Sequence, residues 1–350
     1  MRRTKRLKTN EDNQNNARHA RDYINTLNDD CLILIFELLP ICDRISIERV
    51  CKRWRILAKE SWRYQKFIDF NIDSWGSYKF IDCNDLKKVA KRCGQYIKHL
   101  EVRPWQRISE IKNLQSVAKF LPNLEILDLR DYNLSPKVLK SLLINCENIT
   151  QLSIRNIVKT FKDTDLSDAL SNCKKLQEFR FKNSNIKFSV EIFEALPCDT
   201  IQKINLNKCT RISWNKLPEQ SYFLQVFSKY KNLNSLSLTT CICNNGMSGW
   251  IISCLEKIPL EQLHLSNNDG ITDSFLIELS NKCGKLKNIS IMHSNKITDH
   301  GISALTQMPS LECVTMQALP LVTEKGISHI CRQNKFEWFS ISGTKKIIKK

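Results

Sequence analysis

One apolar pattern recurs along this chain and restricts its fold more than any other feature. The pattern is apolar-x-x-apolar-x-apolar, and its ten copies begin at Ile97, Leu124, Ile149, Leu176, Ile201, Leu233, Leu260, Leu286, Leu311 and Phe336. Successive copies are 25 to 27 residues apart, except for one step of 32. The alternation within each copy is the period of a strand with one buried face. Because one strand cannot bury that face alone, the copies are predicted to stack against each other.

The stretch Gly270–Ile291 gives the complete repeating unit. Thr272 and Asp273 provide a helix start, and apolar residues follow at helical spacing up to Leu279. The strand pattern then closes the unit. We therefore predict an α/β solenoid, with parallel strands on the concave side of an arc and helices outside. The longer step places an insertion between Asn207 and Tyr230.

Several of the fifteen cysteines occupy fixed places in this repeat. Cys146, Cys173, Cys198 and Cys283 lie three residues before the first strand anchor, and Cys209 and Cys241 lie three residues after the last. A thiol at a repeated position packs as a small buried hydrophobe. No CxxC pair with a partner His pair occurs, so we predict neither a metal site nor a cofactor.

The segment from Leu27 to Pro40 differs from the repeats, because it is apolar on nearly every side of a predicted helix. Asp43 is expected to cap a second helix, with Ile47, Val50, Cys51 and Trp54 on one stripe. About forty residues are few for an independent core. A bundle this small and apolar predicts docking against a partner helix.

The stretch LNDDCLILIFELLPICDRISIERVCKRWRILAKESW resembles an F-box. The matching positions are Leu27, Leu32, Ile35, Phe36, Leu39, Pro40, Asp43, the run Val50–Trp54, and Trp62. Asn28 departs from the family pattern, which usually has Pro there. The repeats, with Ile271-Thr-Asp273 and its counterparts at Ile297 and Val322, resemble the cysteine-containing leucine-rich repeats often joined to F-boxes.

The F-box resemblance implies binding to the Skp adaptor of a cullin-RING ubiquitin ligase. The residues carried over as adaptor-binding are Leu27, Leu32, Ile35, Phe36, Leu39, Pro40, Val50, Cys51 and Trp54. Cullin and RING subunits would then be partners through the adaptor. The loss of Pro at position 28 is expected to weaken docking slightly, since Pro pre-sets the entry to a helix.

The expected domain organisation follows from these segments. It comprises a disordered basic tail (1–22), the F-box (23–64), a connecting and capping segment (65–95) with a helix over Asp82–Cys93, the repeats (96–342) and a second basic tail (343–350). The tails carry nine of the surplus cations, so a net charge of +18 becomes +9 for the body. No apolar run is long enough for a membrane span, and we expect a cytoplasmic or nuclear protein.

No enzymatic motif is present: the sequence has no phosphate-binding glycine loop, nucleophile elbow or zinc-protease signature. The six histidines are scattered at His19, His99, His264, His293, His300 and His329. The chain is therefore predicted to be a non-catalytic protein.

The concave surface can be predicted from strand alternation, because residues beside the inward anchors point the other way. Basic residues concentrate there in the early repeats, at Arg103, Arg130, Arg155, Arg180, Lys182 and Lys203. Arg155, Arg180, Lys182 and Lys203 lack acidic partners in the two columns that follow the anchors. These four residues, with Arg103 and Arg130 beside them, are predicted to bind an acidic or phosphorylated protein segment. The alternative is a solvated charged face, with Glu101, Asp128 and Glu178 as neighbours.

Two functions are consistent with the sequence. In the first, the chain is the substrate-recognition subunit of an SCF-type cullin-RING ubiquitin ligase, which tethers its target near the charged ubiquitin-conjugating enzyme. In the alternative, it is a basic leucine-rich scaffold that binds an acidic protein or nucleic acid without ligase assembly. The predicted concave columns contain few aromatic residues for base stacking, and Trp338 is the exception.

Overall fold

The structure, a computed structural model, describes residues 23–76, 81–102, 114–130, 135–155, 162–182, 189–209, 222, 224–241, 248–332 and 336–343. The predicted tail 1–22, residues 344–350, Arg103 and most of the predicted insertion lie outside the described residues. The chain divides into two compact units. The first comprises Met1–Gln65 with Asn71–Tyr78, and the second comprises Lys66–Phe70 with Lys79–Lys350.

The described part of the first unit is helical. Its elements are η1 (Tyr23–Thr26), α2 (Asp29–Glu37), α3 (Ile41–Ile47), α4 (Lys52–Ser61), η2 (Trp62–Tyr64) and α5 (Ile72–Trp75). Asn28 caps α2, since its side-chain oxygen accepts a hydrogen bond from the Cys31 amide at 2.8 Å. The residue that replaces the usual Pro thus starts the helix by another route.

The core of this unit lies between α2 and α4. Leu32, Ile33 and Phe36 from α2 pack against Leu57 and Ala58 from α4. Leu27, Leu39, Ile47 and Trp54 cover the edges of this cluster and remain partly exposed. One face of α2 therefore supplies three of the five buried side chains of this cluster.

The second helix predicted from Asp43 onward is wrong in its extent. Two helices form instead: Asp43 lies in the first turn of α3, and residues 48–50 form a turn before α4. Cys51 caps α4 through its sulfur, which lies 3.4 Å from the Trp54 amide. Glu48 in the turn accepts a hydrogen bond from the buried Trp62 indole at 3.2 Å, and this contact fixes the break. Val50 is consequently exposed and shares no stripe with Trp54.

The second unit is built on one sheet of eleven parallel strands that follow the order of the chain. The strands are β1 (Phe67–Ile68), β2 (His99–Val102), β3 (Ile126–Arg130), β4 (Gln151–Arg155), β5 (Glu178–Lys182), β6 (Lys203–Asn207), β7 (Ser235–Thr239), β8 (Gln262–Ser266), β9 (Asn288–Met292), β10 (Cys313–Gln317) and β11 (Trp338–Ser342). The predicted solenoid is confirmed, and β1 adds a short strand ahead of the ten repeats.

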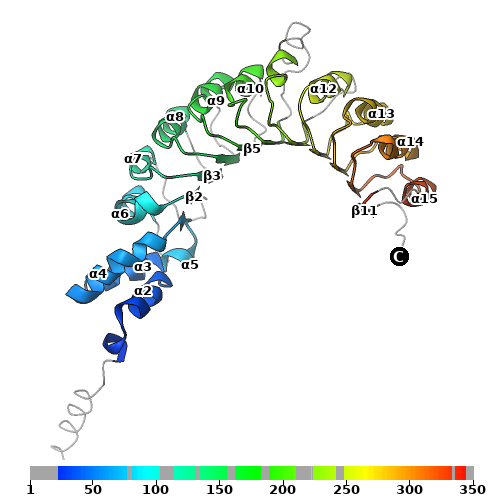
Figure 1. Cartoon of the computed structure of the whole chain (residues 1–350). Coiled ribbons are helices and arrows are strands. Elements are labelled where there is room, and N and C mark those ends of the chain that lie inside the picture. Colours follow the sequence, from blue (N-terminus) through cyan, green and yellow to red (C-terminus); the bar gives the residue numbers. More distant parts are fainter. Residues whose placement is uncertain are drawn as a thin grey trace, which may run out of the picture. The chain divides into compact units, whose positions relative to one another are not determined.

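Helices cover the convex side of the sheet (Figure 1). They are α6 (Cys83–Cys93), α7 (Gln115–Ala118), α8 (Pro136–Asn145), α9 (Asp163–Leu170), α10 (Val190–Ala195), α12 (Ser248–Leu255), α13 (Asp273–Lys282), α14 (Asp299–Ala304) and α15 (Glu324–Arg332), with the short turns η3 (Gly94–Tyr96) and η5 (Leu305–Gln307). Helix α13 begins directly after Thr272, as predicted, because the Thr272 hydroxyl accepts a hydrogen bond from the Phe275 amide and caps the helix.

The inward strand anchors form the core of this unit. Leu127 and Leu129 of β3, for example, are almost completely buried, as are their counterparts up to β10. In β11 the corresponding Phe339 and Ile341 are only half-buried. Cys146, Cys173, Cys209, Cys241 and Cys283 are buried as predicted, whereas Cys198 is half-buried. Burial raises the pKa of Cys146, Cys173 and Cys283 to about 12, which suits a packing role.

The repeated Thr-Asp signal has a structural explanation. The Asp273 carboxylate accepts hydrogen bonds from the amide and the hydroxyl of Thr298, at 2.8 and 2.5 Å, in the next repeat. Asp299 does the same for Thr323. A β-carbon on Gly301 would lie 2.2 Å from Asp273 Oδ1, so glycine is required where the repeats meet. These residues connect neighbouring repeats.

Candidate functional site

An apolar stripe is exposed along α2 of the first unit. Cys31, Leu34, Ile35 and Leu38 recur at the spacing of one helical face, and all four are exposed. Leu34 is 59% exposed and Leu38, which follows the helix, is 86% exposed. Large apolar side chains in such a row are typical of a protein-interaction surface.

The predicted adaptor-binding residues separate into two groups in the structure. Leu32 and Phe36 are buried in the core, so they support the helix and cannot contact a partner in this conformation. Ile35, Val50 and Cys51 are exposed, and Leu27, Leu39, Pro40 and Trp54 are partly exposed. The sequence interpretation missed Leu34 and Leu38, which helical periodicity could have identified as facing away from Leu32. It also missed Ile56, which is exposed on α4.

Two arginines hold the helices that present this stripe. Arg53 donates to Asp29 at 2.9 Å and to the carbonyl oxygens of Asn25 and Leu27, which fastens the start of α2 to α4. Arg44 is buried and donates to the carbonyl oxygens of Glu37 and Leu39. A cation at the carboxyl end of α2 also complements the helix dipole.

The concave face of the second unit carries three columns of side chains, one from each outward strand position. An open hollow of about 620 Å³ lies on this face, over strands β4 to β9. Arg155, Arg180, Lys182 and Lys203 line it, together with hydroxyl, amide and imidazole groups of the later strands. Four of the predicted substrate-binding residues are therefore brought together. Arg130, on β3, does not line the hollow.

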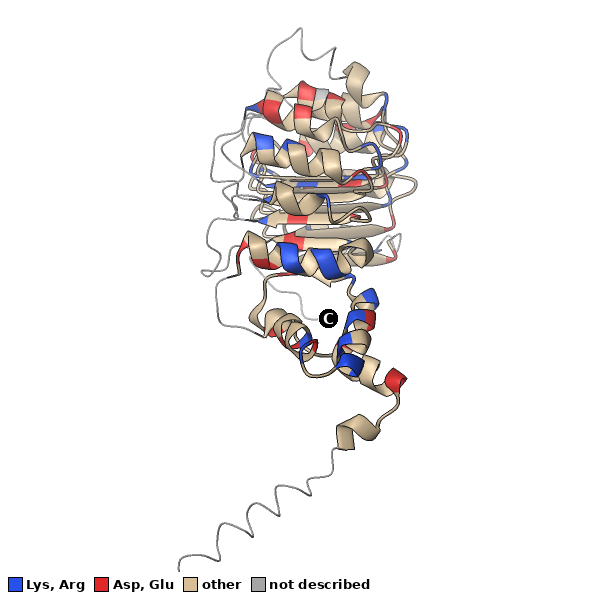
Figure 2. Ribbon diagram, turned by 90° about the vertical axis from the view of Figure 1, so that its left-hand side faces the viewer, with Lys and Arg blue, Asp and Glu red and all other residues tan. Residues whose placement is uncertain are grey.

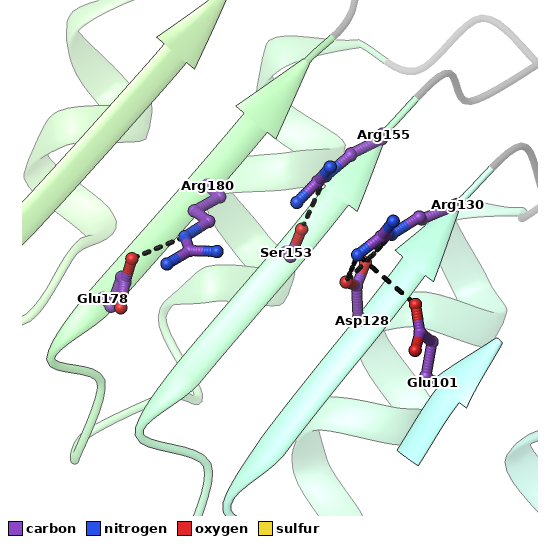
Figure 3. Close-up of polar contacts among 7 residues, drawn as sticks. All are labelled: Glu101, Asp128, Arg130, Ser153, Arg155, Glu178 and Arg180. Carbon is purple, nitrogen blue, oxygen red and sulfur yellow. Dashed lines mark hydrogen bonds and ion pairs between the residues drawn. The ribbon is translucent and has the colours of Figure 1, made fainter. Parts of the chain in front are cut away.

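Arg130 is neutralised by its neighbours (Figure 3). Its guanidinium lies 2.5 Å from the carboxylate of Asp128 and 3.3 Å from that of Glu101 on β2. Both carboxylates are largely buried. A second anion would have to compete with this pair, so Arg130 fits the interpretation of a structural ion pair better than that of a ligand contact.

Arg180 also has an acidic partner, the residue that the alternative of a solvated charged face named as a neighbour. Its Nε donates to Glu178 two residues earlier on the same face of β5 (Figure 3). The sequence prediction considered only two columns, and Glu178 stands in the third. Arg155 on β4 donates to Ser153 at 3.1 Å.

Lys182 and Lys203 differ from these arginines. Within the described residues, neither ammonium group makes a hydrogen bond or an ion pair. Lys182 lies directly opposite Arg155 in the register of β4 and β5, and Lys203 lies opposite Glu178. Adjacent like charges such as Arg155 and Lys182 are unfavourable unless an anion screens them.

The half of the hollow on β7 to β9 is neutral. Ser237, His264 and Ser290 form one row across its floor, since they are register partners in adjacent strands. Desolvation by burial lowers the pKa of His264 below its usual value, so the imidazole is neutral near pH 7. Desolvation by burial also lowers the pKa of His99 on β2.

The charged residues as a whole do not single out one face. Lysine, arginine, aspartate and glutamate occur on the strands and on the covering helices of the repeat unit (Figure 2). Within the described residues, no group of three or more His, Cys, Asp or Glu is placed to hold a metal ion. In the same part of the chain, no helix has the length and apolar character needed to cross a membrane.

Comparison with known proteins connects the first unit to a family. Residues 24–66 match the F-box domain. The chain is 22% identical over 307 residues to human F-box/LRR-repeat protein 12, covering 85% of this chain and 79% of that protein. It is also 22% identical over 343 residues to "Putative RNA-binding protein EEED8.10" of Caenorhabditis elegans. That match covers 88% of this chain but only 45% of the relative, so the chain spans about half of its length.

Solved structures give looser similarities. The leucine-rich-repeat protein LegL7 of Legionella pneumophila superposes with a TM-score of 0.48 at 16% identity, covering 79% of this chain and 93% of LegL7. A chain of the Rad7 and Elc1 complex in yeast superposes with a TM-score of 0.42 at 16% identity, covering 93% of this chain and 96% of that one. Neither superposition guides the assignment of function.

Proposed function

Because an F-box domain at residues 24–66 precedes a leucine-rich-repeat sheet, this chain is an F-box protein with leucine-rich repeats, and we propose that it is the substrate-recognition subunit of an SCF-type cullin-RING ubiquitin ligase. The F-box would dock on the Skp adaptor, and the repeat arc would hold the target protein for ubiquitination and proteasomal degradation. The contribution of this chain is then tethering, which raises the effective concentration of the target, and it carries out no chemistry.

The exposed apolar stripe on α2 supports the docking step most directly. Leu34, Ile35 and Leu38 leave a row of apolar surface in water, although Leu32 and Phe36 on the opposite side complete the internal core. Burying such a row against a helix of the adaptor would recover the free energy that its exposure costs. Arg53 and Arg44 keep α2 fixed, so little ordering is needed on binding.

Co-purification with the Skp adaptor tests this proposal. The intact chain is expected to co-purify with the adaptor. Leu34→Asp/Leu38→Asp is expected to lower the affinity for the adaptor by roughly 1,000-fold, because each substitution replaces an apolar contact worth about 2 kcal/mol with a charge in the interface. Both residues are exposed, so the variant should retain the circular dichroism spectrum and melting temperature of the parent.

A matched control is available on the repeats. Ile144 on α8 is 46% exposed, so Ile144→Asp makes the same kind of substitution, with one added charge, at an apolar surface position outside the F-box. It should leave adaptor binding unchanged. Failure of the intact chain to bind the adaptor, or equal losses in the control and the double variant, would refute the proposal.

The second function, a nucleic-acid-binding scaffold, has one observation in its favour, the printed name of the C. elegans relative. This chain spans less than half of that protein. Among the described concave positions of strands β3 to β10, no Phe, Tyr or Trp offers a platform for base stacking. Nucleic acid is therefore kept as an outcome in the experiment below.

A further inference from the structure

The hollow on the concave face is positively charged at one end only. Strands β4 to β6 contribute Arg155, Arg180, Lys182 and Lys203, against the single carboxylate of Glu178. Strands β7 to β9, which the structure describes in full, contribute no charged side chain to the lining. A ligand that matches this surface has negative charge at one end and neutral polar groups along the rest.

The cations differ in how readily they can accept a new anion. Arg180, whose side chain is 48% exposed, already forms an ion pair with Glu178. Lys182 and Lys203 have no ionic partner within the described residues, and Arg155 lies directly opposite Lys182. An anion between Arg155 and Lys182 would relieve the repulsion between these two neighbours and gain charge-assisted hydrogen bonds. Lys203 lies opposite Glu178, near the other end of the strands, and adds positive charge to the same side of the hollow. The anion-binding end is therefore centred on Arg155 and Lys182.

The length of the hollow limits the size of the ligand. It extends over the six adjacent strands β4 to β9. Neighbouring strands lie about 4.8 Å apart, so the five intervals span about 24 Å, which corresponds to roughly seven residues of extended peptide. The hydroxyl, amide and imidazole groups of Ser237, Gln262 and His264 can exchange hydrogen bonds with its backbone and polar side chains.

We propose that this hollow binds an extended segment of the target protein, about seven residues long and lying across the strands, with one anionic side chain over Arg155 and Lys182 and neutral polar residues over β7 to β9. The anion is a phosphorylated side chain or a carboxylate, which share the recognition chemistry. The inference rests on the proposed role of the arc in holding a target, and it specifies what the arc recognises.

A nucleic acid fits this surface less well than a peptide. Its phosphates recur at every nucleotide, so about half of them would lie over the uncharged half of the hollow. Two exposed aromatic side chains of the concave columns, Phe67 on β1 and Trp338 on β11, do not line the hollow. Charge at a single end is a property of a peptide with one modified or acidic residue.

Fluorescence anisotropy with the full chain tests the inference. The ligands are fluorescein-labelled heptapeptide pools in which phosphoserine occupies each position in turn and the other positions are drawn from Ser, Thr, Asn, Gln and Gly. Matched pools carry Glu or Ser at the fixed position. A pool with phosphoserine or Glu within two residues of one end should bind at least tenfold tighter than the all-neutral pool and the centrally charged pools. A phosphoserine preference assigns the anion to a phosphate, and a Glu preference assigns it to a carboxylate.

Two variants identify the binding end. Lys182→Ala/Lys203→Ala should weaken the best pool at least tenfold. Lys137→Ala/Lys325→Ala removes the same charge from exposed positions on α8 and α15 and should leave binding unchanged. Equal binding of the neutral pool, no loss in the Lys182/Lys203 variant, or tighter binding of a seven-nucleotide RNA would overturn the inference.

Adaptor co-purification, measured on the same preparations, separates this inference from the proposed function. A chain that binds the adaptor but shows no preference for charged pools rejects the inference alone. A chain that binds the end-charged pools but not the adaptor rejects the ligase role and retains the peptide site.

Discussion

The two units of this chain differ in where their apolar side chains lie. The F-box exposes a row of large apolar residues on α2, including Leu34 and Leu38, opposite the face of α2 that packs in the core. The repeat sheet buries its strand anchors and presents polar side chains on its concave face. Exposed apolar surface suits a permanent partner, whereas a polar concave face suits a ligand that is recognised through charge and released.

The largest expected effect comes from the small core of the F-box. Leu32→Ala should cost about 3 kcal/mol, because it leaves a cavity in a cluster that has few other contacts, and the F-box should unfold. Leu38→Ala, on the exposed row, should keep the melting temperature within about 2 °C and weaken adaptor binding at least tenfold. Calorimetry and an adaptor titration measure both. Similar melting temperatures for the two variants would remove the distinction between core and surface on α2.

In the repeats, replacing a buried Leu with Ala should lower the stability without affecting adaptor binding. Leu263→Ala on β8 should lower the free energy of unfolding by about 3 kcal/mol, since the side chain is fully buried. Ser237→Ala on the neighbouring strand faces the hollow and should change it by less than about 0.5 kcal/mol. Urea unfolding followed by circular dichroism compares them. A cost for Ser237→Ala as large as that for Leu263→Ala would mean that the concave face contributes to the core.

A smaller loss is expected from a buried amide that joins two repeats. Asn268 donates to the Leu238 carbonyl at 2.7 Å and accepts from the Cys241 amide at 2.8 Å. Asn268→Ala should therefore cost about 2 kcal/mol, because both backbone groups lose their partner in the interior. Asn281→Ala, at an exposed position of α13, is the control and should cost less than about 0.5 kcal/mol. Equal urea midpoints for the two variants would contradict this.

The smallest effect is a pH dependence from His264. Its pKa is lowered by burial, so between that value and the ordinary pKa the unfolded chain binds a proton that the folded chain does not. Stability should therefore fall as the pH is lowered through this interval, and His264→Gln should reduce the fall. Urea midpoints between about pH 7.5 and pH 5 cover the interval. His99 is lowered in the same direction and remains in both proteins, so the difference between them isolates His264.

Much of the candidate site could be predicted from the sequence, because strand alternation fixes which residues face the concave side. Arg155, Arg180, Lys182 and Lys203 were predicted there and do line one hollow. Glu178 was named as a neighbour of these cations, but its pairing with Arg180 depends on which rotamers meet on the face of β5, so the sequence alone could not assign it. The break between α3 and α4 was missed because Glu48 bonds to Trp62, fourteen residues further along the chain.

The sequence by itself determined the architecture, since a strand period repeated every 25 to 27 residues can bury its apolar face only by stacking. It also determined that residues 24–66 form an F-box, because the order and spacing of apolar residues identify that domain. Only the tertiary structure decided which apolar residues of α2 face water and which cations of the arc remain without an acidic partner. Burial and ion pairing depend on neighbours far apart in sequence, which Arg130 and Glu101 illustrate by meeting across adjacent repeats.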